Sequence, residues 1–184
     1  MGAFGKGQGQ IHRMPLMKLF FIAGTQLPFP RMDEAIVKLL ENNDQAFNIT
    51  YQSGQREDFS TKNLMQYKLM NEVLFMETLL DADLIIAHAG VGTLLECIEN
   101  KKPVLMFPRL AKLGEHRNDH QLSTAKKIQE IFQIPYLLTV KDLINYIQNR
   151  DLRPEIGFYF RQMMHNRTEL QKNLHNSIKE LLSR

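Results

Sequence analysis

Short apolar runs alternate with segments of helical spacing along most of this 184-residue chain, and this alternation constrains the fold more than any other feature. Compact apolar runs are typical of buried strands, and apolar residues three or four positions apart are typical of amphipathic helices. The predicted strands are Leu16–Ala23, Ala46–Gln52, Asn63–Lys68, Asp83–Ala87, Val104–Phe107 and Tyr136–Thr139. The predicted helices are Met32–Glu41, Glu72–Leu80, Thr93–Asn100, Arg117–Phe132 and Val140–Asn149. Strands alternating with helices predict a Rossmann-like α/β fold with a doubly wound parallel sheet.

The two ends of the chain differ from this central part. Residues 1–15 are rich in Gly and Gln and have no apolar periodicity, so we expect a flexible extension or a tag. Residues 16–150 are expected to form the sheet domain, and residues 151–184 a helical extension. In that extension, apolar residues recur at near-helical spacing: Leu170, Leu174, Ile178 and Leu181. This stripe fits either a helix that packs on its own sheet or one that docks a second subunit.

Composition narrows the possible classes of protein. A single cysteine, Cys97, excludes an internal disulfide and favours a reducing compartment. The longest apolar run, Leu16–Ala23, is interrupted by Lys18 and is too short to span a bilayer, and the residues before it lack the features of a secretory signal. We therefore expect a cytoplasmic protein. The net charge of +3 comes without the basic and aromatic stripe of a nucleic-acid binder, so no nucleic-acid partner is expected.

Ligands of open α/β sheets bind at the carboxyl ends of the strands, so the loops there form the candidate site. After the first predicted strand, Gly24 lets backbone approach a ligand and Thr25 can hydrogen-bond to it, although a tight turn explains both residues equally well. After the fourth strand, Gly90 and Gly92 precede a helix whose first N–H groups lack internal partners, and such an end suits a phosphate or diphosphate. Thr93 can cap that helix or donate to a phosphate oxygen.

Glu96 lies about one turn into that helix, where a carboxylate can accept both hydroxyls of a ribose or simply stabilise the helix end. The loop after the next strand is dense in polar residues, which packing alone does not explain. It holds cations for a diphosphate and hydrogen-bonding groups for sugar hydroxyls: Arg109, Lys112, His116, Arg117, Asn118, Asp119 and Gln121. Asn118 and Asp119 also fit a helix cap, and each cation alone fits a solvated surface.

Together these motifs resemble glycosyltransferase family 28 in its C-terminal-domain type. The likeness is strongest to PssE-like subunits of exopolysaccharide and capsule assembly, which are related to the cytosolic subunit of the dolichol-linked N-acetylglucosamine transferase. The shared residues are Gly24-Thr25-Gln26, Pro28-Phe29, Arg31, Ala82-Asp83, His88-Ala89-Gly90, Gly92-Thr93, Glu96, Lys102-Pro103, Pro108-Arg109, Gly114-Glu115-His116 and Asn118-Asp119-His120-Gln121. The resemblance covers about Lys18 to Asn149 and implies the C-terminal, donor-binding half of a GT-B glycosyltransferase with an added C-terminal helix. The segment Asn63–Leu80 departs from the family pattern and leaves the uracil contacts open.

The resemblance implies a UDP-sugar donor site. Its implied contacts are Gly90, Gly92 and Thr93 with the diphosphate, Glu96 with the ribose, and Asn118, Asp119 and Gln121 with the sugar. Gly24 and Thr25 would line the same cleft, and Arg109 would stabilise the leaving diphosphate. The candidate catalytic residues are His88, His116 and Asp119.

The implied enzyme is an inverting, metal-independent hexosyltransferase that needs no cofactor besides its UDP-sugar donor. Its implied partner is a membrane-associated subunit that recruits it to the inner face of the membrane and brings the lipid-linked acceptor. Asp81 and Asp83 form an Asp-x-Asp pair, but they enter a strand at its amino end, so a solvated turn is the better interpretation. Two other classes stay open: a non-catalytic regulatory module that binds nucleotide sugars, and a nucleotide-sugar epimerase, which the chain length disfavours.

Overall fold

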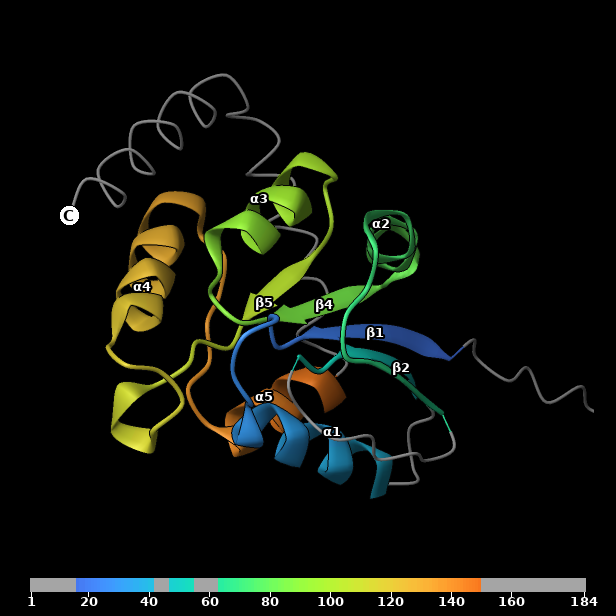
Figure 1. Ribbon diagram of the computed structural model, residues 1–184, viewed down its shortest axis with the longest axis horizontal. Coiled ribbons are helices and arrows are strands. Elements are labelled where there is room, and N and C mark those ends of the chain that lie inside the picture. The colour runs from blue at the N-terminus through green and yellow to red at the C-terminus, as the bar shows by residue number, and fades with distance from the viewer. Residues whose placement is uncertain (1–15, 42–46, 55–62, 150–184) are drawn as a thin grey trace, which may run out of the picture.

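The computed structural model describes residues 16–41, 47–54 and 63–149, and the predicted extensions 1–15 and 151–184 lie outside these ranges. Within them, five parallel strands form one sheet in the order β3-β2-β1-β4-β5 (Figure 1). The strands are β1 (Met17–Ile22), β2 (Phe47–Gln52), β3 (Leu64–Tyr67), β4 (Leu84–Ala87) and β5 (Val104–Met106). The helices are α1 (Pro30–Glu41), α2 (Glu72–Asp81), α3 (Val91–Glu99), α4 (His120–Phe132) and α5 (Val140–Gln148). The predicted Rossmann-like parallel sheet is confirmed.

Each face of the sheet buries its own apolar cluster, because successive side chains of a strand point to opposite faces. Leu19 and Phe21 of β1 point to the face that α1 and α5 cover, and Phe20 and Ile22 point to the face that α2, α3 and α4 cover (Figure 1). Since β1 lies in the middle of the sheet, it is apolar on both faces. This explains why Leu19–Ile22 is a continuous apolar run rather than an alternating one.

The order of the strands places a crevice between β1 and β4. From β1 the chain continues to β2 on one side, and it later returns to β4 on the other side of β1. Loops that leave neighbouring strands in opposite directions open a crevice at the carboxyl edge, which is where open α/β sheets bind ligands. Ile22 pairs with Ala87 at that edge, so the residues that follow them in the chain emerge side by side.

Several predicted elements and boundaries are wrong, and helix α1, for example, begins at Pro30 rather than Met32. Tyr136–Thr139 is no strand: Tyr136 makes one isolated bridge to Met106, because Pro135 lacks a backbone donor and Thr139 already caps α5. Helix α3 begins two residues earlier than predicted, with Gly90 as its N-cap, so Thr93 does not cap it. Helix α4 begins at His120 rather than Arg117, because Asp119 takes the N-cap position.

Candidate functional site

His88 is the first residue after β4, and its ring lies in the crevice between glycines of two loops. A Cβ added at Gly24 would lie 3.0 Å from its Nε2 atom, and one added at Gly90 would lie 2.9 Å from its Cε1 atom. Gly24 has a φ of +85°, and Gly54, with a φ of +64°, lies directly against the Gly24 carbonyl oxygen. Both backbones thus need glycine for conformation as well as for space.

The surroundings of His88 keep its ring neutral. Burial lowers its pKa from 6.5 to about 4, and the positive charge of Arg109 acts in the same direction. Its Nδ1 atom lies 3.3 Å from the carbonyl oxygen of Ile22, and since a carbonyl only accepts, we assign the ring proton to Nδ1. Nε2 then has a free lone pair beside Gly24 and Gly90. The ring therefore presents an acceptor, or after protonation a cationic donor, at the crevice.

The N-terminus of α3 lies next to this ring. Its N-cap, Gly90, has no side chain, and no side-chain group caps the helix among the residues that the structure describes. The first N–H groups of a helix have no partner inside the helix and carry its positive dipole. A Cβ added at Gly92 would meet no atom of the described residues within 4 Å, so there is open space beside this first turn. Thr93 follows as the third helical residue, in position to donate its hydroxyl. This arrangement suits an anion.

Glu96 lies further along α3 and is half-buried. Its carboxylate Oε2 accepts a long hydrogen bond of 3.4 Å from the side chain of Asn100, one turn later. Such a bond constrains the carboxylate little, so Glu96 remains able to accept hydrogen bonds from a ligand.

Arg109 is placed differently from the prediction that it faces a diphosphate. The residue is only 3% exposed, and its guanidinium donates to the carbonyl oxygens of Pro28, of Ala23 at 2.7 Å, of Leu27 at 2.6 Å and of Glu115 at 3.3 Å. These carbonyls use its donors inside the protein. Arg109 therefore ties the loop after β1 to the loop after β5, and its charge reaches the crevice only through space.

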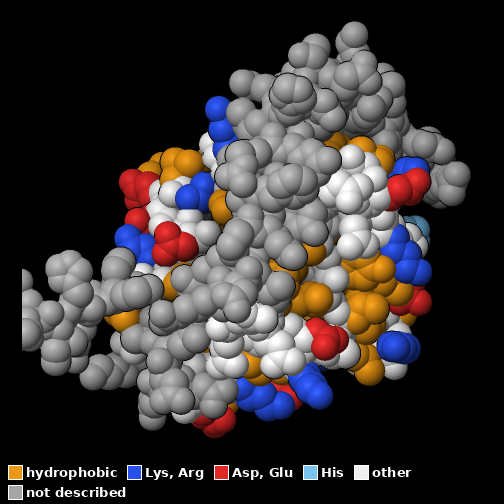
Figure 2. Space-filling model, turned by 180° about the vertical axis from the view of Figure 1, so that it is seen from behind, with side chains coloured by type: hydrophobic (Ala, Val, Ile, Leu, Met, Phe, Trp, Pro, Cys, Tyr) orange, Lys and Arg blue, Asp and Glu red, His pale blue; other side chains and the backbone are white. Residues whose placement is uncertain are grey.

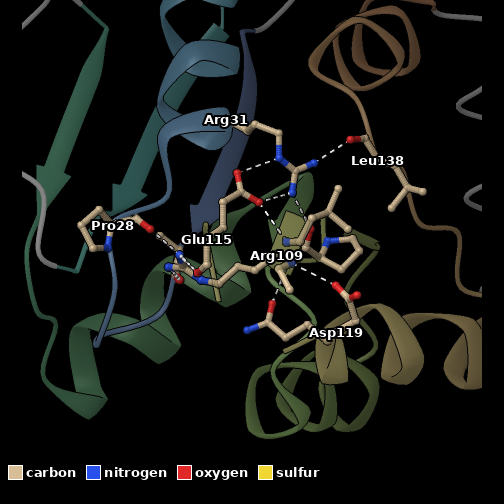
Figure 3. Close-up of polar contacts among 11 residues, drawn as sticks. Pro28, Arg31, Arg109, Glu115, Asp119 and Leu138 are labelled. Atoms are coloured by element: carbon tan, nitrogen blue, oxygen red, sulfur yellow. Dashed lines mark hydrogen bonds and ion pairs between the residues drawn. The ribbon is translucent and has the colours of Figure 1, made fainter. Parts of the chain in front are cut away.

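Arg31, in the first turn of α1, makes the reciprocal connection (Figure 3). It donates two hydrogen bonds to the carboxylate of Glu115, from Nε at 2.7 Å and from Nη2 at 2.5 Å. It also donates to the carbonyl oxygens of Pro108 at 2.7 Å and Leu138 at 2.6 Å. The ion pair is largely shielded from solvent, since the side chain of Arg31 is 11% exposed and that of Glu115 is 3% exposed.

Two phenylalanines separate the arginines. The rings of Phe29 and Phe107 stack with centroids 5.6 Å apart. The guanidinium carbon of Arg109 lies 4.5 Å from the Phe29 centroid, and that of Arg31 lies 4.5 Å from the Phe107 centroid. The ring faces attract the cations, which compensates part of the cost of burying them.

The outer part of the loop after β5 turns its polar groups toward solvent. Asp119 is exposed and accepts a hydrogen bond of 3.0 Å from the backbone of Ala111, and Asn118 lies 3.1 Å from Nδ1 of the half-buried His116. Gln121 accepts a hydrogen bond of 3.0 Å from the backbone N–H of Arg109. Asp119 is the N-cap residue of α4, but its side chain makes no cap hydrogen bond to the helix. The candidates for sugar contact are thus brought together at the end of this loop and in the first turn of α4, on the same edge as His88.

Sequence reasoning missed the roles of Arg31, Glu115 and Gly54. The family resemblance included Arg31 and Glu115 without a function, and no signal in the sequence connected residues 84 positions apart. Gly54 lies two residues after the second predicted strand, and Gly24 directly follows the first; a glycine close behind each strand was the available signal.

Other classes of site find less support. Across residues 16–41, 47–54 and 63–149 no group of three or more His, Cys, Asp and Glu side chains is placed to hold a metal ion. Lys18 contacts both carboxylates of the Asp-x-Asp pair: its side chain forms an ion pair of 2.6 Å with Asp81, and its backbone N–H donates a hydrogen bond of 2.8 Å to Asp83.

Figure 2 shows basic and acidic side chains interspersed around the described surface of one face. In the described part of the chain, no helix has the length and hydropathy to span a membrane.

Comparison with known families decides the class of protein. A model of the glycosyltransferase family 28 C-terminal domain matches residues 19–182. The chain belongs to this family. The predicted family is therefore confirmed, and the match includes His88, the N-terminus of α3 and the loop after β5.

Two curated relatives share part of the sequence. One is the UDP-N-acetylglucosamine–N-acetylmuramyl-(pentapeptide) pyrophosphoryl-undecaprenol N-acetylglucosamine transferase of Prochlorococcus marinus, which is 32% identical over 101 residues. The aligned residues make up 54% of this chain and 26% of that relative. The other is the UDP-N-acetylglucosamine transferase subunit ALG13 of Candida albicans, which is 27% identical over 94 residues. Here the aligned residues make up 50% of this chain and 30% of that relative. The aligned part thus spans less than a third of each relative.

Solved structures show the same fold. MurG of Acinetobacter baumannii superposes with a TM-score of 0.58 and 20% identity, over 89% of this chain and 51% of that chain. The calicheamicin glycosyltransferase CalG4 superposes with a TM-score of 0.62 and 14% identity, over 100% of this chain and 48% of that chain. The chain therefore has the architecture of the C-terminal, Rossmann-like half of a GT-B glycosyltransferase.

Proposed function

We propose that this chain is the donor-binding part of an inverting UDP-sugar glycosyltransferase, a hexosyltransferase acting on a lipid-linked acceptor in exopolysaccharide or capsule synthesis. The observation that carries the proposal is the N-terminus of α3. Among the described residues it has no side-chain cap and nothing packs against Gly92, and it lies beside the ring of His88 in a family 28 domain. The relatives named above transfer N-acetylglucosamine from a UDP carrier, and the one from Prochlorococcus acts on a lipid diphosphate.

In the proposed reaction an acceptor hydroxyl attacks the anomeric carbon, the bond from that carbon to the diphosphate oxygen breaks, and UDP leaves. The first N–H groups of α3 stabilise the negative charge that develops on the diphosphate. Thr93 donates to the same group, Glu96 accepts the ribose hydroxyls, and Asn118, Asp119 and Gln121 face the sugar. Because the diphosphate is negative, it raises the proton affinity of His88, whose Nε2 then donates to a phosphate oxygen.

The acceptor and its base are proposed to come from a membrane-associated partner, which recruits this chain to the inner face of the membrane. A neutral ring whose pKa is about 4 is a weak base, so His88 is poorly suited to deprotonate a hydroxyl. Large apolar side chains are also exposed around the ligand edge of the sheet, as expected where a second body covers it: Leu27, Leu69, Val73 and Leu113, with 37%, 66%, 67% and 53% of their surface exposed.

Isothermal titration with UDP and a panel of UDP-sugars tests the donor site. We expect binding between micromolar and low-millimolar concentrations and weaker binding of other nucleoside diphosphates. If UDP does not bind in that range, the donor-site proposal fails.

The matched variant is Gly92→Ala. A Cβ at this position meets no atom within 4 Å in the described part of the chain, and alanine favours the helix by about 0.5–1 kcal/mol, so the variant should fold at least as well as the wild type. Its methyl group occupies the space beside the free N–H groups. UDP affinity should therefore fall while stability does not, and unchanged affinity would place the diphosphate elsewhere.

Partner dependence has its own test. Transfer of labelled sugar to lipid should need membranes that contain the partner, and transfer by the isolated chain to a purified lipid acceptor would contradict a half-enzyme. Nucleotide binding with no transfer in any such membrane fraction would support the regulatory module instead.

A further inference from the structure

Two buried arginines cross between the loops of the proposed donor site. Arg31 belongs to the segment after β1 and reaches the backbone of the segment after β5, at Pro108. Arg109 belongs to the segment after β5 and reaches the backbone of the segment after β1, at Ala23 and Leu27. Each loop is therefore held by a guanidinium that the other loop supplies.

Glu115 joins the two halves of this connection. Its carboxylate accepts both hydrogen bonds from Arg31 and a third, of 3.0 Å, from the backbone N–H of Leu110, while its carbonyl oxygen accepts one from Arg109. Its backbone N–H in turn donates to the carbonyl oxygen of Leu110 at 3.3 Å. Glu115 thereby closes the short loop around Ala111–Leu113, directly before the residues proposed to face the sugar.

Stability alone is a poor reason for such an arrangement. Two buried guanidinium groups and a carboxylate lose their hydration, and apolar residues of similar volume often stabilise a core as well or better. A bidentate ion pair does fix one geometry, because both partners are planar and accept few orientations. Here that geometry fixes the first turn of α1 against the loop of residues 110–121.

We propose that Arg31 and Glu115 are positioning residues for donor binding: their ion pair holds the loop of residues 110–121 in its binding conformation before the UDP-sugar arrives. The inference rests on the proposed function, since it concerns the same site. Pre-ordering increases affinity because the loop has lost its conformational entropy already during folding. Neither side chain contacts the donor in this proposal.

Three variants test it by titration with UDP, with circular dichroism and thermal unfolding measured on the same samples. Glu115→Gln keeps the shape of the side chain and removes its charge, and Arg31→Lys keeps the charge and removes the planar fork. Lys38→Gln is the control, because Lys38 forms a 2.5 Å ion pair with Glu34 on the same helix, but both side chains are 50% exposed to solvent.

We expect Glu115→Gln and Arg31→Lys to bind UDP at least about tenfold more weakly at temperatures where they are fully folded, with a more unfavourable binding entropy. Lys38→Gln should bind as the wild type does. A merely structural ion pair would lower the unfolding temperature and leave the affinity of the folded protein unchanged, so affinities within about twofold of the wild type would overturn the proposal. If Arg31→Lys binds UDP as tightly as the wild type and only Glu115→Gln binds more weakly, the charge of residue 31 is sufficient, and the proposal that its planar guanidinium positions the loop is wrong.

Hydrogen exchange of the wild type gives an answer even if a variant does not fold. The proposal expects the amides of Leu110, Ala111 and Glu115 to be protected already in the free protein, because their acceptors lie inside the clamped loop. Free exchange of these amides that ends only when UDP is added would overturn it. Protected amides together with absent UDP binding would instead contradict the donor site and leave the pre-ordered loop standing.

Discussion

Acid should destabilise this domain through His88, and the size of the effect follows from its surroundings. In the unfolded chain the imidazole has its ordinary pKa of 6.5, and in the folded domain burial lowers it to about 4. Between these two values the unfolded chain binds a proton that the folded domain does not. Stability from this group is therefore complete above the unfolded pKa and falls as the pH decreases toward the folded pKa.

The magnitude is about 1.4 kcal/mol for each pH unit inside this window. Between about pH 7 and about pH 5 the wild type should lose about 2 kcal/mol of unfolding free energy through this one side chain. Urea unfolding at both pH values measures it, with His88→Gln as the variant that cannot titrate. Groups that titrate in both proteins cancel when the two pH dependences are subtracted.

His120→Gln is the matched control, because His120 is exposed at the start of α4. It should keep the pH dependence of the wild type. Equal pH dependences in wild type and His88→Gln would refute the reasoning that the buried ring stays neutral. A direct check is the NMR titration of the His88 ring in the wild type, whose midpoint should lie well below 6.5.

Four further outcomes are expected. Gly90→Ala should cost about 1–3 kcal/mol in urea unfolding, because the new methyl group displaces the His88 ring; a stability equal to that of the wild type would contradict the packing described. Glu96→Ala should weaken UDP binding by about tenfold or more at nearly unchanged stability, and an unfolded variant would indicate a structural role. UDP-sugar binding, measured by titration calorimetry in buffers of different ionisation enthalpy, should take up a proton at mildly acidic pH as His88 becomes a donor, and buffer-independent heats would exclude this. Binding should also survive EDTA, since helix N–H groups stabilise the diphosphate, and its loss would indicate a metal ion.

The central part of the fold could be predicted because the buried strands consist almost entirely of apolar residues. The run Leu16–Ala23 is apolar on both faces, and β1 occupies the centre of the sheet. The predicted ends of helices and strands were wrong where a neighbouring proline or helix cap favoured another local structure. Tyr136–Thr139 has strand-like residues, but Pro135 removes a donor and the cap at Thr139 starts the next helix. The spacing of apolar residues carries no information about such proline and capping effects.

The edge of the sheet that holds the candidate site could be inferred from the sequence, but the contacts that its residues make inside the protein could not. The carboxyl-edge rule located the loops after β1, β4 and β5, since it depends only on chain order. Arg109 was expected to stabilise the leaving diphosphate because it is a cation in a polar loop at the ligand edge of the sheet. Its burial depends on the Phe29 ring and on three carbonyl groups about 80 residues earlier in the chain, and such a long-range contact leaves no local pattern.

Burial divides the polar residues of the loop after β5 into two layers with different tasks. Arg109 and Glu115 are 3% and 4% exposed and bind other parts of the same protein, whereas Asn118 and Asp119 are exposed. A change in the inner layer moves the whole loop and should affect every donor alike, since the carbonyl groups held there belong to the backbone. In the proposed donor site a change in the outer layer alters single hydrogen bonds to a sugar, and such bonds discriminate strongly between hydroxyl configurations. Donor preference should therefore respond to Asn118 and Asp119, while affinity for UDP itself should respond to Arg31 and Glu115, although all four residues belong to one hydrogen-bonded region.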